Sequence, residues 1–220
     1  MIETVKILIA LALPLCLALF LARGEVRRFA GFFTAGLLCA FLAVHINSFL
    51  ASASGMAATE ALVKLTPINE EILKALPVFL YLLAARNPER GDAAGVALAV
   101  GLGFVTYENC YLLVQLGGGD LLLTLIRGLA AGFMHISCAV LLGYGLSLLL
   151  NHRYMLLPGA FGLLCVQSVF HATYNLLVTA SSGWQGAGYA LPLAMAAALL
   201  LYRVPAKPSG VAGEDERRSE

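Results

Sequence analysis

Ionisable side chains recur inside segments that are otherwise apolar. In chain order the main ones are Glu70, Glu71, Lys74, Glu108, His135 and His171. A carboxylate can take a proton from water while imidazoles or a metal stabilise the developing oxyanion. One glutamate with two histidines also matches the ligand set of a catalytic zinc, which keeps a position open for water. These residue types therefore suit hydrolysis.

The ligands expected for a bound metal, with zinc as the first choice, are Glu108, His135 and His171. No HExxH motif is present, which excludes a standard zincin, and no GxSxG or Ser/Lys arrangement stands out. The same residues also suit a proton or ion relay, so a coupled membrane transporter is the alternative to a hydrolase. A non-catalytic membrane scaffold is a third hypothesis. Spacing alone does not separate these classes.

Two adjacent acids and one lysine begin the predicted helix 67–85. A purely structural explanation pairs Lys74 with Glu70 at i,i+4 or with Glu71 at i,i+3. The two acids point about 100° apart on a helix, so one lysine cannot serve both well. One carboxylate then faces a cavity, and the sequence leaves open which one. Pro77 also frees the carbonyl of Leu73 from the helix ladder.

The other candidates lie on separate predicted helices. Glu108 has no basic partner within its own helix, so it needs one from a neighbour. His171 has Gln167 and Asn175 four residues to either side, which places a polar stripe on one helix face. Such a stripe can fix an imidazole tautomer or form a seam between helices. His135 alone is as well explained as a core histidine, and His45 is a further candidate.

The segments that carry these residues are long enough to cross a bilayer. Of the 220 residues, 60% are hydrophobic and 12% charged, and the mean hydropathy is +0.85. Seven apolar segments approach the roughly 20 residues that a membrane helix needs, at 5–22, 29–51, 67–85, 93–116, 121–150, 156–180 and 184–203. We therefore expect an all-α integral membrane protein with about seven spans. The sequence has no basic patch with interleaved aromatic residues, so we expect no nucleic-acid partner.

Orientation follows from the basic residues. The loops after the first, third and fifth spans, with the C-terminus, hold Arg23, Arg27, Arg28, Arg86, Arg90, Arg153, Arg203, Lys207, Arg217 and Arg218. The other side holds Lys6 and Lys64, with Arg127 just inside a span as an interface anchor. The positive-inside rule predicts an outside N-terminus and a cytoplasmic C-terminus. Residues 1–204 are expected to form one membrane domain, and 205–220 a disordered cytoplasmic tail.

This orientation places the buried polar residues of separate helices at similar depth, toward the outer face. An ionisable group inside a span costs roughly 2.5–3.5 kcal/mol. Six isolated groups would cost on the order of 15 kcal/mol, which is too much unless they are clustered and paired. We therefore predict one hydrated cluster. The five cysteines lie in apolar segments without a CxxC pair and predict no disulfide framework.

Four motifs occur in a recognisable order. Glu70 to Lys74 matches EExxK, Phe104 to Asn109 matches FxxxEN, and His135 and His171 follow on the next two helices. Together, over about residues 67–175, they resemble the PrsW family of intramembrane proteases, which are related to the CAAX-processing and bacteriocin-immunity membrane proteases. The CAAX-type branch would show EExxxR and FxxxH, so Lys74 and Glu108 favour the PrsW branch.

The resemblance implies an endopeptidase in a prokaryotic plasma membrane that cuts membrane-associated proteins near the extracytoplasmic face. An anti-sigma factor or a similar single-pass regulator is the kind of substrate it implies, with the lipid bilayer as surroundings. By position, the catalytic candidates are Glu70, Glu71, Glu108, His135 and His171, and the supporting residues are Lys74, Phe104, Asn109 and Asn175. The family is classed as metallopeptidases, although water activated by glutamate alone also occurs in related proteases.

Overall fold

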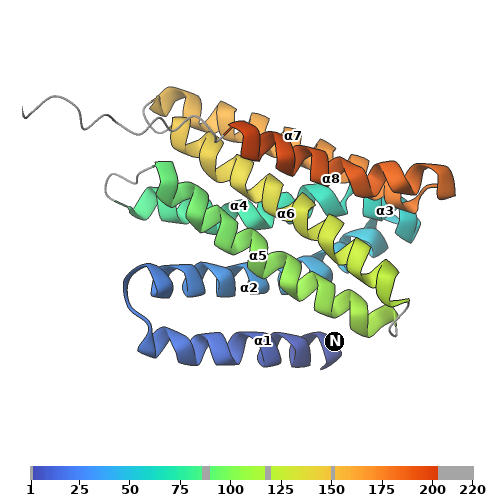
Figure 1. Ribbon diagram of the computed structural model, residues 1–220, viewed down its shortest axis with the longest axis horizontal. Helices are drawn as coiled ribbons and strands as arrows, with labels where there is room; N and C mark the ends of the chain where they lie inside the picture. The colour runs from blue at the N-terminus through green and yellow to red at the C-terminus, as the bar shows by residue number, and fades with distance from the viewer. Residues whose placement is uncertain (1, 86–89, 117–119, 150–151, 203–220) are drawn as a thin grey trace, which may run out of the picture.

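The computed structural model describes residues 2–85, 90–116, 120–149 and 152–202, and these are almost wholly helical (Figure 1). The helices are α1 (Ile2–Leu21), α2 (Gly24–Ser54), α3 (Ala58–Lys64), α4 (Thr66–Ala84), α5 (Arg90–Leu116), α6 (Leu121–Leu149), α7 (Arg153–Thr179) and α8 (Ser182–Tyr202). The starts of α1 and α8 lie at the same end of the bundle as α3, on the right of Figure 1. The tail expected at 205–220 lies outside the described residues.

The predicted class, an all-α multi-pass membrane protein, is confirmed. Within the described ranges, six helices are long and apolar enough to cross a membrane: α1, α2, α5, α6, α7 and α8. Helix α4 corresponds to the other predicted span, but Glu70, Glu71 and Lys74 lower its apolar character. The number of spans and their sidedness remain predictions.

Helix α3 was not predicted. It has seven residues, too few for a periodic pattern, and it fills the connection between α2 and α4. Its Glu60 and Lys64 form an exposed i,i+4 ion pair, with 2.6 Å between the Oε1 and Nζ atoms. The helix packs against α2, α4 and α7, so it belongs to the bundle despite its length.

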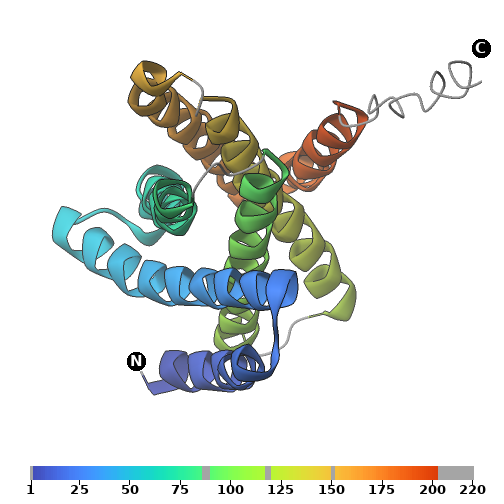
Figure 2. The same ribbon diagram turned by 90° about the vertical axis from the view of Figure 1, so that its left-hand side faces the viewer.

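Helix α4 buries one face in the bundle, whereas its other face, with Ile72, Leu76 and Leu80, is exposed. It packs against α2, α5, α6 and α7, and Figure 2 shows it nearly end-on among its neighbours. Its Leu73 carbonyl, freed by Pro77, accepts a hydrogen bond from the Cys39 thiol of α2 at 3.2 Å. A buried carbonyl without a partner would be costly, so Cys39 offsets the break that the proline makes.

Helices α2 and α5 approach each other through glycine. A Cβ atom at Gly36 would clash with the Val100 carbonyl oxygen, and one at Gly103 would clash with the Phe33 carbonyl oxygen. The missing side chains let the two backbones touch, as small residues do between membrane helices. This contact fixes the position of α5 against α2.

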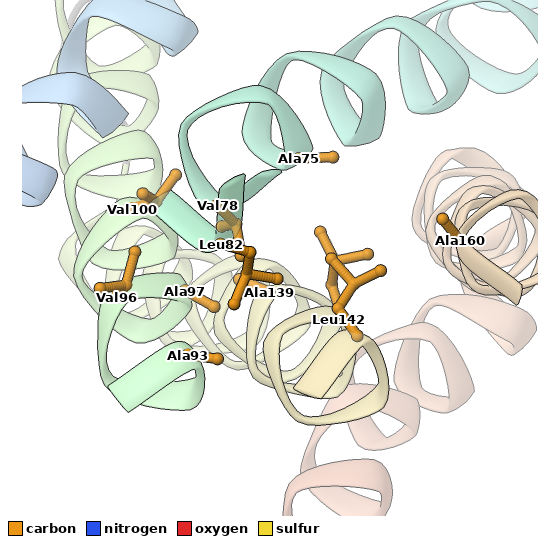
Figure 3. Close-up of a cluster of buried hydrophobic side chains, with 11 residues drawn as sticks. Ala75, Val78, Leu82, Ala93, Val96, Ala97, Val100, Ala139, Leu142 and Ala160 are labelled. Atoms are coloured by element: carbon orange, nitrogen blue, oxygen red, sulfur yellow. The ribbon is translucent and has the colours of Figure 1, made fainter. Parts of the chain in front are cut away.

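An apolar cluster fills the half of the bundle away from α3 (Figure 3). Its buried members come from α4, α5, α6 and α7: Ala75, Val78, Leu82, Ala93, Val96, Ala97, Val100, Ala139, Leu142, Leu146 and Ala160. On each of these helices, the residues of the cluster are farther from α3 than the ionisable residues are. It therefore closes the polar interior on that side.

Candidate active site

All six ionisable residues come together in the structure, on four helices. Helix α4 supplies Glu70, Glu71 and Lys74, and α5, α6 and α7 supply one residue each. Five of them are buried, whereas the side chain of Glu108 is 25% exposed. Clustering explains how the bundle tolerates so many ionisable groups, because acidic and basic side chains lie beside one another.

Lys74 and Glu71 form the buried ion pair of the site. The Lys74 Nζ atom lies 2.7 Å from Glu71 Oε1, and both side chains are only 1% exposed. The same Nζ atom lies 2.9 Å from His135 Nδ1 and 5.0 Å from the centre of the Phe104 ring. Lys74 therefore neutralises Glu71 and also holds His135, while Phe104 supports the lysine from one side.

The two histidines have opposite hydrogen-bonding patterns. An ammonium group has no lone pair, so Lys74 donates to Nδ1 of His135, and a neutral His135 carries its proton on Nε2. Glu71 Oε1 lies 2.9 Å from Nδ1 of His171. A carboxylate only accepts, so His171 donates from Nδ1 and keeps a lone pair on Nε2. Helix α4 thus assigns a different tautomer to each histidine.

Both Nε2 atoms point toward the remaining carboxylates. His135 Nε2 lies 2.6 Å from Glu108 Oε2, although their orientation does not give a hydrogen bond, and His171 Nε2 lies 3.8 Å from Glu70 Oε2. Neither Glu70 Oε2 nor Glu108 Oε2 has a hydrogen-bond partner among the described residues. Buried polar atoms are normally paired, so these atoms have capacity for water, an ion or a substrate group.

Glu70 is held by two asparagines that were not predicted as site residues. Asn47 Nδ2 on α2 donates to Glu70 Oε1 at 3.0 Å, and Asn69 Nδ2 donates to Asn47 Oδ1 at 2.7 Å. Asn69 directly precedes Glu70 in the sequence, but nothing there connects it with Asn47. The contact depends on how α2 and α4 pack.

Three buried side chains could together bind a metal ion, and this group differs in one residue from the predicted ligand set. One ligand atom each from Glu70, His135 and His171 lies within 4.8 Å of the others. This group contains Glu70, whereas the predicted ligand set contained Glu108. Glu70 Oε2 and His171 Nε2 offer lone pairs as they stand. His135 Nε2 would offer a lone pair only in the other tautomer, with the proton on Nδ1, where that atom no longer accepts from the Lys74 ammonium group.

A cavity of about 530 Å³ opens onto the cluster. Glu70, Glu108, His135 and His171 line it, whereas Glu71 and Lys74 do not. Its walls include residues of α2, α3, α6, α7 and α8, among them Ala58, Ala61, Leu62, Arg127, Tyr174 and Tyr189. The cavity is on the α3 side of the cluster, opposite the apolar core, so the site is reached from one end of the bundle.

The other predicted residues lie around this centre. Asn175 Nδ2 donates to the Leu62 carbonyl at 3.0 Å, so it ties α7 to α3 and does not contact His171. Asn109 Nδ2 faces α6 beside Gly128. Gln167 is fully buried and makes no hydrogen bond to the described residues. His45 lies away from the cavity, with Nε2 3.3 Å from the Thr4 hydroxyl of α1.

One comparison with known proteins gives a match. The family model described as PrsW family intramembrane metalloprotease matches residues 25–202, from the start of α2 to the end of α8. No curated protein and no solved structure matches the chain. The match extends beyond the motifs at 67–175 to nearly the whole bundle and leaves out α1. With its glutamates and histidines gathered on four helices, the chain belongs to the PrsW family of intramembrane metalloproteases.

Proposed function

We propose that this protease cuts membrane proteins within the cavity beside Glu70, Glu108, His135 and His171, near the extracytoplasmic face of a prokaryotic plasma membrane. The observation that carries the proposal is the arrangement of these four side chains. They line one cavity and leave carboxylate oxygens unpaired in it. The expected substrate is a single-pass protein such as an anti-sigma factor.

The two adjacent glutamates have different tasks in this proposal. Glu71 meets both Lys74 and His171 through its Oε1 atom and does not line the cavity, so it orients the histidines. Glu70 faces the cavity with a free oxygen. We therefore propose Glu70 as the acid that meets water or an ion, a choice between the two glutamates that the sequence left open.

Glu108 is the proposed proton carrier. Its side chain is the most accessible of the cluster, and its Oε2 atom lies beside His135 Nε2. It takes a proton from the attacking water and returns it to the leaving amine, as a general base and acid does. The imidazoles, which line the same cavity, would stabilise the negative charge that develops on the scissile carbonyl oxygen.

The proposed ligands of a metal, zinc first, are Glu70, His135 and His171. A bound ion would lower the pKa of a water molecule and polarise the scissile carbonyl. Glu71 would then act behind His171, because a carboxylate on the second imidazole nitrogen fixes ring orientation and tautomer.

The proposal is tested by comparing the fragments of membrane proteins in cells. Terminal-peptide mass spectrometry is applied to cells with the wild type, Glu71→Gln or Glu108→Gln. We expect new termini close to the outer ends of single-pass helices with the wild type alone. Glu108→Gln leaves the Lys74–Glu71 pair intact, so it separates lost chemistry from lost folding. Identical fragment sets from three well-expressed proteins would refute the proposal.

A further inference from the structure

The carboxylate of Glu70 receives its only hydrogen bond within the described residues from Asn47. The donor atom Nδ2 lies 3.0 Å from Oε1, which leaves Oε2 free beside His171 Nε2. Asn47 therefore holds the Glu70 carboxylate in an orientation in which its other oxygen faces the histidine. It also limits rotation of a carboxylate that is only 6% exposed.

The orientation of Asn47 is in turn set by Asn69. An asparagine side chain has a donating NH2 end and an accepting oxygen end. Asn69 Nδ2 donates to Asn47 Oδ1 at 2.7 Å, so the NH2 end of Asn47 faces Glu70. If the amide of Asn47 flipped, its oxygen would meet the Glu70 carboxylate and its NH2 group would meet that of Asn69. The hydrogen bond to Glu70 would be lost, and the one between the asparagines would survive only if the Asn69 amide flipped as well.

We propose that Asn69 and Asn47 form a one-way amide relay that positions Glu70 for the reaction. Neither asparagine takes part in the reaction itself. Asn69 holds the side chain of Asn47, and Asn47 holds the carboxylate of Glu70. The inference rests on the proposed role of Glu70 in the active site. It differs from a simple packing role, because the direction of the hydrogen bonds matters and not only the volume of the two side chains.

Substitution at Asn69 tests the direction of these hydrogen bonds without changing Glu70. Asn69→Asp keeps the size and shape of the side chain but replaces the donor with an acceptor. The Asn47 amide must then flip to donate to Asp, which turns its oxygen toward Glu70. Asn69→Ala only removes the support. The relay thus predicts that Asn69→Asp, although nearly isosteric, lowers the activity more than Asn69→Ala does.

The measurement is kcat and KM of each variant in proteoliposomes at neutral pH. The substrate is a peptide spanning a terminus found by the fragment comparison. We expect kcat of Asn69→Asp to fall about tenfold or more, as when a hydrogen bond to a charged group is lost. The kcat of Asn69→Ala should fall less, and KM should change little in both. Thermal unfolding in detergent confirms that both variants are folded.

A double-mutant cycle excludes a direct effect of the new charge. In an Asn47→Ala background the relay is already broken, so Asn69→Asp should lower kcat no further. An equal additional loss in that background would overturn the proposal, as would Asn69→Asp with a kcat equal to or above that of Asn69→Ala. Glu70→Gln is the separate check of the site, because its full activity would refute the role of Glu70 itself.

Discussion

At the scale of single residues, the site depends on one buried cation that serves two partners. Lys74 contacts the Glu71 carboxylate and Nδ1 of His135, so it joins α4 to α6 as well as neutralising an acid. A buried ion pair adds little net stability, yet removing one partner leaves a charge that is neither paired nor hydrated. Lys74 should therefore matter for folding as much as for chemistry.

Lys74→Met should lower the free energy of unfolding by about 3–5 kcal/mol, because it leaves the charge of Glu71 without its buried cation. Lys64→Met is the matched control, since Lys64 belongs to the exposed pair with Glu60. Its effect should stay within about 1 kcal/mol. Thermal or denaturant unfolding in detergent measures both, and equal losses would contradict the burial argument. Adding Glu71→Gln to Lys74→Met should recover part of the stability.

At the scale of the helices, the position of Glu108 depends on how closely α5 approaches α2. Gly36 and Gly103 lie at that contact, each against a carbonyl of the other helix. A side chain at either position would push the helices apart and shift Glu108, which lies further along α5. The sequence carries the glycines, but their partner helix becomes known only in the folded bundle.

Gly103→Ala should destabilise the protein by about 1–3 kcal/mol, the usual cost of overpacking. Gly95→Ala on the same helix is the control, because nothing lies within 4 Å of its Cβ position. Alanine is the better helix former, so Gly95→Ala should leave stability unchanged or raise it by up to about 1 kcal/mol. In a thermal unfolding assay, a lower melting temperature for Gly103→Ala, with an unchanged or higher one for Gly95→Ala, would confirm the contact between α2 and α5. Equal effects would contradict it.

At the scale of the whole molecule, the bundle is asymmetric along its length. The apolar cluster that includes Val78, Val100 and Leu142 closes one half, and the cavity opens beside α3 in the other. Among the described residues, the cavity gives water and substrate access to the charged residues from the α3 side. If the positive-inside rule holds, that side is the exterior of the cell.

Cysteine labelling in intact cells measures this orientation. In a background without the native cysteines, Glu60→Cys on α3 should react with a membrane-impermeant thiol reagent. Glu25→Cys, at the opposite end of the bundle and well exposed, should react only after lysis. The reverse pattern would place the cavity on the cytoplasmic face. It would also move the proposed cleavage site there.

The sequence by itself determined the class of the protein. Apolar runs of about 20 residues, interrupted by single ionisable groups, predict membrane helices with a buried polar cluster, because a lone charge in lipid is too costly. The motifs around Glu71, Glu108, His135 and His171 also led to the correct family. These conclusions need only residue type, order and spacing.

Only the tertiary structure decided what each side chain faces. It separated Glu71, paired with Lys74, from Glu70, which faces the cavity, and it brought Asn47 to Glu70 across 23 positions of the chain. It also showed that Asn175 holds α3 and that Glu71 holds His171. Local patterns fix which segments are helices. The rotation of each helix about its axis follows from packing against its neighbours, and that rotation selects the partners.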